Sequence, residues 1–173
     1  MAEYLEAGSL RAEVLKVAAA EVGVREIPLG SNTGPRVNQY LDAVGVAPGQ
    51  PWCMAFVFWC FKQAAAARGV SNPVPRNGSV IHCWQLAQSQ PGTNVVPAEK
   101  ANADPSLVLP GMVFFIDTGA EHGHAGFVVD VVVGTLVTIE GNTNSAGLRE
   151  GIGVFQRSSR KIRDINMGFI AFA

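Results

Sequence analysis

Apolar residues recur at helical spacing over the first part of the chain. Between Leu10 and Gly23 they return every three or four positions after Ser9, a suitable N-cap, which predicts an amphipathic helix. A second helix is expected from Pro35, which suits the first helical position, to Gly45, which can end a helix in a left-handed conformation. The turn-rich segment between these two helices is expected to be a loop.

A third helix is expected to be the central one. It runs from about Pro51 to Arg68, and Gly69 follows as a stop signal. Nearly every face of this helix is apolar, and a helix without a polar face is buried on all sides. The rest of the chain is therefore expected to pack around it.

Beyond residue 69 the pattern changes from helical to extended. Residues 70–110 are rich in proline and are expected to be mostly loop, with one short helix at Ser79–Gln88. Short runs of Val, Ile and Phe then predict an antiparallel sheet, at Met112–Ile116, Ala125–Val133, Leu136–Glu140, Gly153–Arg157 and Phe169–Phe172. Helices followed by strands indicate an α+β fold.

Length and charge narrow the choice of function. A chain of 173 residues suits a single domain, with residues 1–9 as a loose lead-in. With 13 Lys and Arg against 14 Asp and Glu, the chain offers no basic face for nucleic acid or for an anionic membrane. No segment has the roughly 20 apolar residues needed to span a bilayer. The first ten residues lack a basic start followed by an apolar run, so we expect no secretory signal peptide.

Cys53 is the first candidate for chemistry. With Gln50 as the helix cap, Cys53 falls in the first turn of the third helix, where unpaired N–H groups and the helix dipole favour a thiolate. Most cysteines in apolar helices are core residues, and Cys60, two turns further along, is interpreted in that way. All three cysteines are expected to be free thiols. A nucleophilic Cys53 would need a histidine and a polar orienting group from elsewhere in the chain.

His124 and Glu140 are the candidates for these partners. His124 leads into the second expected strand among small residues that leave room for a substrate, although a surface histidine without a role would also fit. Glu140 ends an apolar strand, where a carboxylate often has a partner, whereas Asn142 alone could be a turn former. His122 and His124 lack the further ligands of a metal site, so no metal is expected.

A hairpin with its turn at Gly134 and Thr135 would bring His124 and Glu140 towards the same end of the sheet. A plain two-residue turn there would place Glu140 opposite Val129, on the face away from His124. We therefore predict a bulge or a three-residue turn in this hairpin.

Three segments together resemble one family. Residues 51–57 (PWCMAFV), 123–128 (GHAGFV) and 139–143 (IEGNT) are similar, in order and spacing, to the CHAP family of cysteine, histidine-dependent amidohydrolases/peptidases. The resemblance extends from about Val14 to Phe172. It implies a papain-like α+β fold, in which N-terminal helices pack on a small antiparallel sheet of about five to six strands.

The resemblance also implies roles for single residues. Those that match the family's catalytic pattern are Cys53 as nucleophile, His124 as base, Glu140 as the residue that orients the histidine, and Asn142 as an extra polar group. Trp52, beside the nucleophile, and Asn32, in a loop that some members share, are expected to bind substrate. Met112 departs from the aspartate that usually follows Pro-Gly in the family. No metal or cofactor is implied.

Most members of this family cut bacterial peptidoglycan. The resemblance thus implies cleavage of an amide bond, by an N-acetylmuramoyl-L-alanine amidase or a peptide endopeptidase, with peptidoglycan as the partner. Without a signal peptide, we expect synthesis in the cytoplasm and action on the cell wall or periplasm after lysis or injection. The settings that fit are a phage endolysin, an antibacterial effector and a cell-wall remodelling enzyme, of which the last is disfavoured by the lack of a signal peptide. An effector would have an immunity or delivery protein as a further partner.

Two other classes of function remain open on the sequence. One is a cytoplasmic amidase or acyl transferase that acts on a small substrate, for which a papain-like fold is also suited. The other is a catalytically idle cell-wall binding module that keeps the fold and the cleft.

Overall fold

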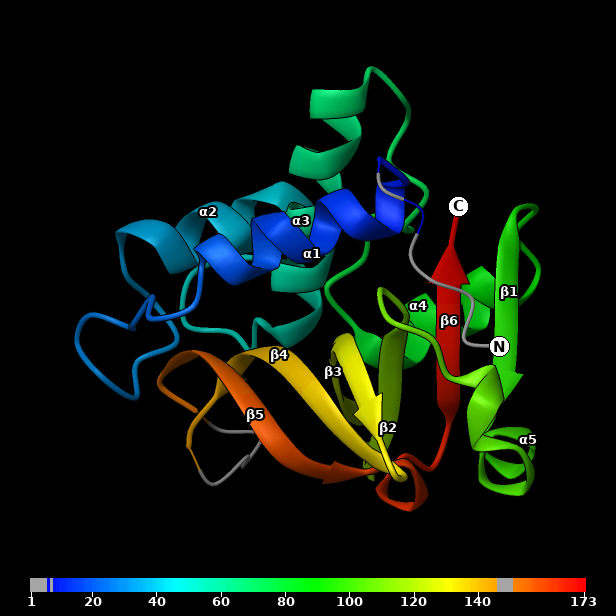
Figure 1. Ribbon diagram of the computed structural model, residues 1–173. Helices are drawn as coiled ribbons and strands as arrows, with labels where there is room; N and C mark the ends of the chain where they lie inside the picture. The colour runs from blue at the N-terminus through cyan, green and yellow to red at the C-terminus, as the bar shows by residue number, and fades with distance from the viewer. Residues whose placement is uncertain (1–5, 7, 146–150) are drawn as a thin grey trace.

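The computed structural model describes residues 6, 8–145 and 151–173, so most of the expected lead-in at residues 1–9 lies outside the described residues. The elements of the described chain, in order, are α1 (Leu10–Ala20), α2 (Pro35–Val44), α3 (Cys53–Arg68), α4 (Val80–Gln88), β1 (Thr93–Pro97), α5 (Ala98–Ala103), the 3-10 turn η1 (Pro105–Leu107), β2 (Val113–Gly119), β3 (His122–Val132), β4 (Thr135–Thr143), β5 (Gly153–Lys161), the 3-10 turn η2 (Ile162–Asp164) and β6 (Gly168–Phe172) (Figure 1).

The six strands form one antiparallel sheet in the order β1-β6-β2-β3-β4-β5. Helices α1, α2 and α3 lie together across one side of it (Figure 1). The α+β class and the expected number of strands are therefore confirmed. Among the described residues, no helix has both the length and the apolar composition needed to cross a membrane.

Helix α3 is central, as its all-apolar sequence predicts. Its buried side chains pack against α1 and α2 on one side and against the sheet on the other. Phe56 of α3, for example, meets Phe127 of β3 edge to face at a ring distance of 5.9 Å. The opposite face of the sheet has its own apolar cluster, in which Phe114, Val128 and Leu136 pack with residues of α5 and η2 and with Val108, which follows η1. Residues on both faces of β3 and β4 are thus buried.

Two regions differ from the sequence prediction. Helix α1 ends at Ala20 rather than at Gly23, and the Gly23 N–H donates to the carbonyl oxygen of Val154 at 3.1 Å instead of to a carbonyl of the helix. The proline-rich region expected to be loop contains β1, α5 and η1. Strand β1 forms because β6 offers it an antiparallel partner, which no local pattern reveals.

The β3–β4 hairpin contains the irregularity that the sequence predicts. Its turn lies at Val133 and Gly134, one residue earlier than expected, and Val132 pairs with Thr135. Continued without interruption, this register would place Glu140 opposite Phe127, on the helix side of the sheet. An extra residue on β3, Val129, shifts the pairing so that Phe127 lies opposite Ile139. The prediction of a bulge is confirmed, and Glu140 comes to share a face with His124.

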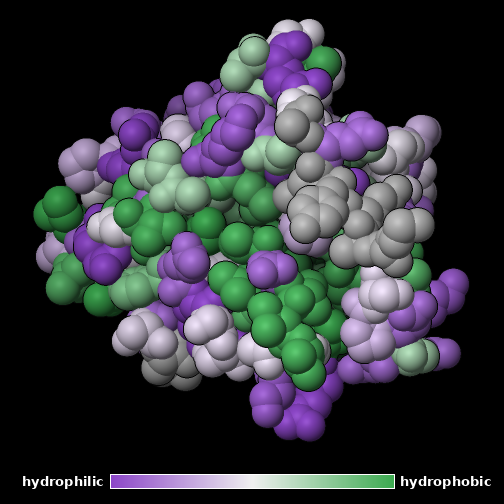
Figure 2. Space-filling view, in the orientation of Figure 1, coloured by the Kyte–Doolittle hydropathy of each residue, from purple (hydrophilic) through white to green (hydrophobic). Residues whose placement is uncertain are grey.

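The end of this hairpin projects into solvent. Val132 is 55% exposed and Val133 is 100% exposed. In the space-filling view an apolar area extends from the centre of the face towards this end of the molecule (Figure 2). The predicted catalytic residues lie at the other end of β3 and β4 and are buried.

Candidate active site

Cys53 is the first residue of α3. The N-cap is Trp52, whose backbone is not helical (φ −128°, ψ 14°), and the first intrahelical bond runs from the Phe56 N–H to the Trp52 carbonyl oxygen at 2.9 Å. The helix therefore starts two residues later than expected, and Gln50 is not its cap. The N–H groups of residues 53–55 have no partner within the helix. They therefore favour a negative charge, such as a thiolate, at the start of the helix.

Trp52 is a core residue, and its expected part in substrate binding stays a prediction. Its side chain has 0% exposure, stacks on Tyr40 at a ring distance of 5.6 Å and donates its indole N–H to Glu26 Oε1 at 2.8 Å. Its contacts fix the start of α3, and with it the position of Cys53.

The Cys53 thiol lies beside β3 where the pairing of β3 with β4 has ended. The last paired residues on this side of the hairpin are Phe127 and Ile139. Cys53 Sγ is 3.9 Å from the carbonyl oxygen of Gly123, and the backbone N–H of Ala125 also interacts with the sulfur. The helix start thus brings the thiol to the strand that carries His124.

His124 is oriented by Glu140. The two side chains are 3% and 0% exposed, and His124 Nε2 lies 2.7 Å from Glu140 Oε2. Nδ1 is buried and forms no regular hydrogen bond within the described residues, yet the Cys53 thiol is close enough to interact with the ring. Nδ1 is therefore the nitrogen left for exchange of a proton with the thiol.

These contacts change the pKa values of both reacting groups. Burial raises the pKa of Cys53, but His124 and the N–H groups of Ala125 and Met54 outweigh it, so the pKa lies below the ordinary 9.0. Burial lowers the pKa of His124, while interactions with Cys53 and Glu140 raise it to about 9. The geometry thus favours a thiolate paired with an imidazolium.

Gly126 makes room for the histidine and its carboxylate to meet. A Cβ at this position would lie 2.9 Å from Glu140 Cγ and 2.9 Å from the Phe114 ring. The space that small residues leave beside His124, expected for substrate, is on this side filled by Glu140 and Phe114.

Sequence reasoning missed two arginines that surround Glu140. Arg160 contacts both carboxylate oxygens at 2.9 and 2.7 Å, and Arg157 Nη1 lies 3.3 Å from Oε1. Arg157 is the last residue of the strand expected at Gly153–Arg157, and Arg160 lies beyond that strand, in the part of β5 that was not predicted. No local pattern indicated these contacts, because they depend on how β5 pairs with β4.

In the described part of the chain, the other two predicted site residues, Asn142 and Asn32, form no side-chain hydrogen bond with Cys53, His124 or Glu140. Asn142 is 2% exposed, has a left-handed backbone (φ 53°), and its Oδ1 has no hydrogen-bond partner within the described residues. Asn32 also has a positive φ, is partly buried, and accepts the Gly49 N–H at its carbonyl oxygen at 2.9 Å. The roles of Asn142 in catalysis and of Asn32 in substrate binding stay predictions.

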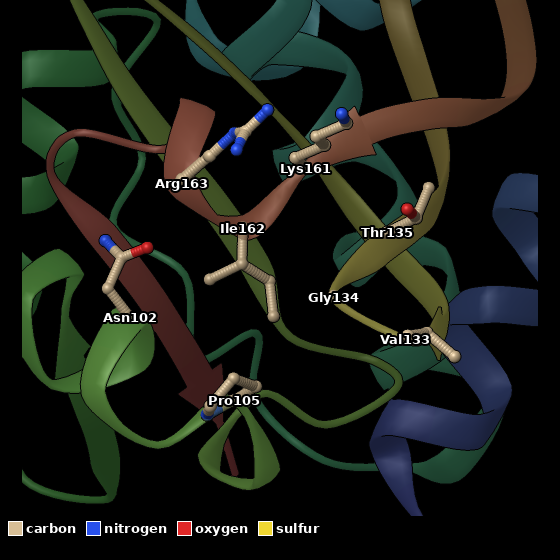
Figure 3. A pocket seen from close by; sticks show the side chains of 8 residues that line it. All are labelled: Asn102, Pro105, Val133, Gly134, Thr135, Lys161, Ile162 and Arg163. Carbon is tan, nitrogen blue, oxygen red and sulfur yellow. The ribbon is translucent and has the colours of Figure 1, made fainter.

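A separate cavity lies at the far end of the β3–β4 hairpin. Its volume is about 360 Å³, and none of the predicted catalytic residues lines it; its walls are Asn102, Pro105, Val133, Gly134, Thr135, Lys161, Ile162 and Arg163 (Figure 3). Within the described residues no group of three or more His, Cys, Asp or Glu side chains could hold a metal ion.

A thiol that faces an imidazole held by a carboxylate is the arrangement of enzymes that cleave or transfer acyl groups through a cysteine. The CHAP domain family model matches residues 45–142, more than half of the chain and a range that includes Cys53, His124 and Glu140. The chain therefore belongs to the CHAP domain family, whose members are generally amidases and peptidases, and the predicted family is confirmed. No curated protein and no solved structure matches the chain.

Proposed function

We propose that this protein is a peptidoglycan hydrolase that cleaves an amide bond, as an N-acetylmuramoyl-L-alanine amidase or a peptide endopeptidase. The observation that carries the proposal is the contact between His124 Nε2 and Glu140 Oε2 at 2.7 Å, which leaves Nδ1 for Cys53 at the start of α3. Membership of the CHAP domain family supports peptidoglycan as the substrate class.

In the proposed reaction the Cys53 thiolate attacks the amide carbonyl carbon. The developing oxyanion is stabilised by the backbone N–H groups at the start of α3, where removal of one such donor typically costs about 100- to 1000-fold in rate. His124 gives its proton to the nitrogen as the C–N bond breaks, which leaves a thioester and a free amine. Water then hydrolyses the thioester with His124 as base, while Glu140 keeps the imidazole in position.

The test is digestion of purified peptidoglycan sacculi of several chemotypes, followed by mass spectrometry of the released muropeptides. The wild type should produce new amine ends that identify the bond, and Cys53→Ala should release none. His122→Ala is a matched control, because His122 is two residues from His124 but exposed. Equal release by the wild type and Cys53→Ala would contradict the proposed nucleophile.

The same experiment separates the wall from other substrates. If a folded wild-type protein releases nothing from any chemotype, the proposed substrate is wrong even if Cys53 reacts as a thiolate. Cys53→Ser should keep the wild-type circular dichroism spectrum and lose turnover, since oxygen and sulfur differ little in volume while serine lacks the low pKa of the thiol.

A further inference from the structure

Glu140 is held by more than His124. It has 0% exposure, and its two carboxylate oxygens also receive Thr138 Oγ1 at 2.6 Å and the side chains of Arg157 and Arg160. A buried carboxylate without compensating partners would be costly and would take up a proton. These contacts therefore decide whether Glu140 is charged when it meets His124.

A bulge in β5 brings both arginines to Glu140. Arg157 lies opposite Thr138, and Arg160 lies opposite Leu136. Two residues of β5, Ser158 and Ser159, thus face the single residue Val137 of β4. Residues three apart on a regular strand point to opposite faces, so without this extra residue only one arginine could reach the carboxylate.

Arg160 has the geometry of a dedicated partner. Its Nε lies 2.9 Å from Oε1 and its Nη2 lies 2.7 Å from Oε2, so one planar guanidinium binds both oxygens. The side chain is 11% exposed, and its guanidinium covers the Phe114 ring at 5.0 Å. The same ring lies 5.9 Å from the His124 ring, so Phe114 packs against both the base and the arginine.

We infer that Arg160, assisted by Arg157, is a positioning residue of the catalytic group: it keeps Glu140 ionised and fixed so that Glu140 orients His124 towards Cys53. Neither arginine lies within the matched range 45–142 of the family model. The inference rests on the proposed function only in one respect, that His124 exchanges a proton with Cys53. It holds for any substrate.

The charged groups around Glu140 come from several elements. Among residues 6, 8–145 and 151–173 they are His124 from β3 and Arg157 and Arg160 from β5, while β2 contributes the non-ionisable Phe114. Cys53, from α3, acts through His124. Loss of a cation beside Glu140 should raise its pKa, weaken its hold on the imidazolium and so raise the pKa of Cys53.

The experiment measures the rate at which iodoacetamide alkylates Cys53 between pH 5 and 10, by mass spectrometry of the Cys53-containing peptide. Arg160→Gln should shift the reactivity profile upward by about one pH unit, which is about tenfold lower reactivity on the acid limb. Arg160→Lys keeps the charge but loses the two-point contact, and its profile should lie between those of the wild type and Arg160→Gln.

The matched control is Arg163→Gln, an exposed arginine three residues further along, which should leave the profile unchanged. If Arg160→Gln does not fold, the Arg160→Lys profile decides the question by itself. A folded Arg160 variant with the wild-type profile would overturn the inference. A shifted profile in a protein that releases nothing from peptidoglycan would support the positioning role and contradict only the proposed substrate.

Discussion

Helix α3 carries two buried cysteines, Cys53 at its start and Cys60 two turns further along, and the pKa values of the two thiols are shifted in opposite directions. Cys53 is 3% exposed and Cys60 is 0% exposed, so water is excluded from both. Yet the pKa of Cys60 is raised well above its usual value by burial and by Glu21, whereas that of Cys53 is lowered. Burial alone makes a thiol inert; a nearby imidazole and the N–H groups at a helix start reverse the effect.

Removal of the His124 imidazole should abolish the difference in pKa between Cys53 and Cys60. This is the largest effect that we expect. In His124→Ala, burial of Cys53 is no longer opposed by a cation, so the pKa of Cys53 should rise towards that of Cys60. Alkylation of Cys53 at pH 7 should fall by about 100-fold or more, since each pKa unit is a factor of ten. Alkylation at the wild-type rate in a folded variant would show that the helix start alone activates the thiol.

A rise in pH should separate the nucleophilic role of the Cys53 thiolate from the role of the His124 imidazolium as a proton donor. The imidazolium of His124, with a pKa of about 9, is lost as the pH rises through that value, while the Cys53 thiolate persists. Amide cleavage should therefore fall by about tenfold per unit above pH 9, because the leaving amine loses its acid. Alkylation of Cys53 should not fall over the same range. Parallel loss of both would indicate unfolding, which circular dichroism at pH 10 checks.

Gly126→Ala should disturb the base without touching either cysteine directly. The new Cβ would meet Glu140 Cγ and the Phe114 ring at 2.9 Å, so Glu140 or β3 must shift. Overpacking of this kind typically costs about 1–3 kcal/mol. We expect a lower Tm and a Cys53 alkylation rate reduced by roughly tenfold at pH 7, equivalent to one pKa unit. Gly134→Ala is the control for destabilisation away from the site: its φ of 73° strains any side chain although nothing lies within 4 Å of the added Cβ, so it should lower the Tm and leave the Cys53 alkylation rate unchanged.

Replacement of Cys60 should have the smallest effect and none on chemistry. Cys60→Ala removes one buried atom from the packed helix, which should lower the free energy of unfolding by about 1 kcal/mol. Peptidoglycan cleavage and the Cys53 alkylation profile should equal those of the wild type. Denaturant unfolding measures the first effect, and a changed profile would show that Cys60 is coupled to the site.

The parts of the fold that were predicted correctly are those with a local signal. Pro35 and Gly45 bound α2 as expected, and Ser79 caps α4 through its hydroxyl. Proline, serine and glycine bias the backbone at their own positions, so a single sequence suffices to place such ends. By contrast β1 is a strand because β6 lies beside it, and the start of α3 is fixed by the bond from Trp52 to Glu26.

In the candidate site, too, the residues with a local sequence signal were predicted and the contacts that depend on tertiary structure were not. Cys53, His124 and Glu140 could be named from short motifs, and the need for a bulge followed from the alternation of side chains along a strand. The contacts of Arg157 and Arg160 with Glu140 could not be predicted, because they depend on a second bulge in a neighbouring strand. Nor could the burial of Trp52 be predicted, because nearness to Cys53 in sequence does not determine the direction of its side chain.

The two bulges have a consequence for tolerance of insertions and deletions. Because side chains alternate along a strand, adding or removing one paired residue between His124 and Glu140, or between Glu140 and Arg160, would turn one partner to the wrong face. Changes of two residues would preserve the faces. Exchange of hairpins with related chains should therefore succeed when the lengths differ by an even number and fail when they differ by an odd number, even where the residue types are identical.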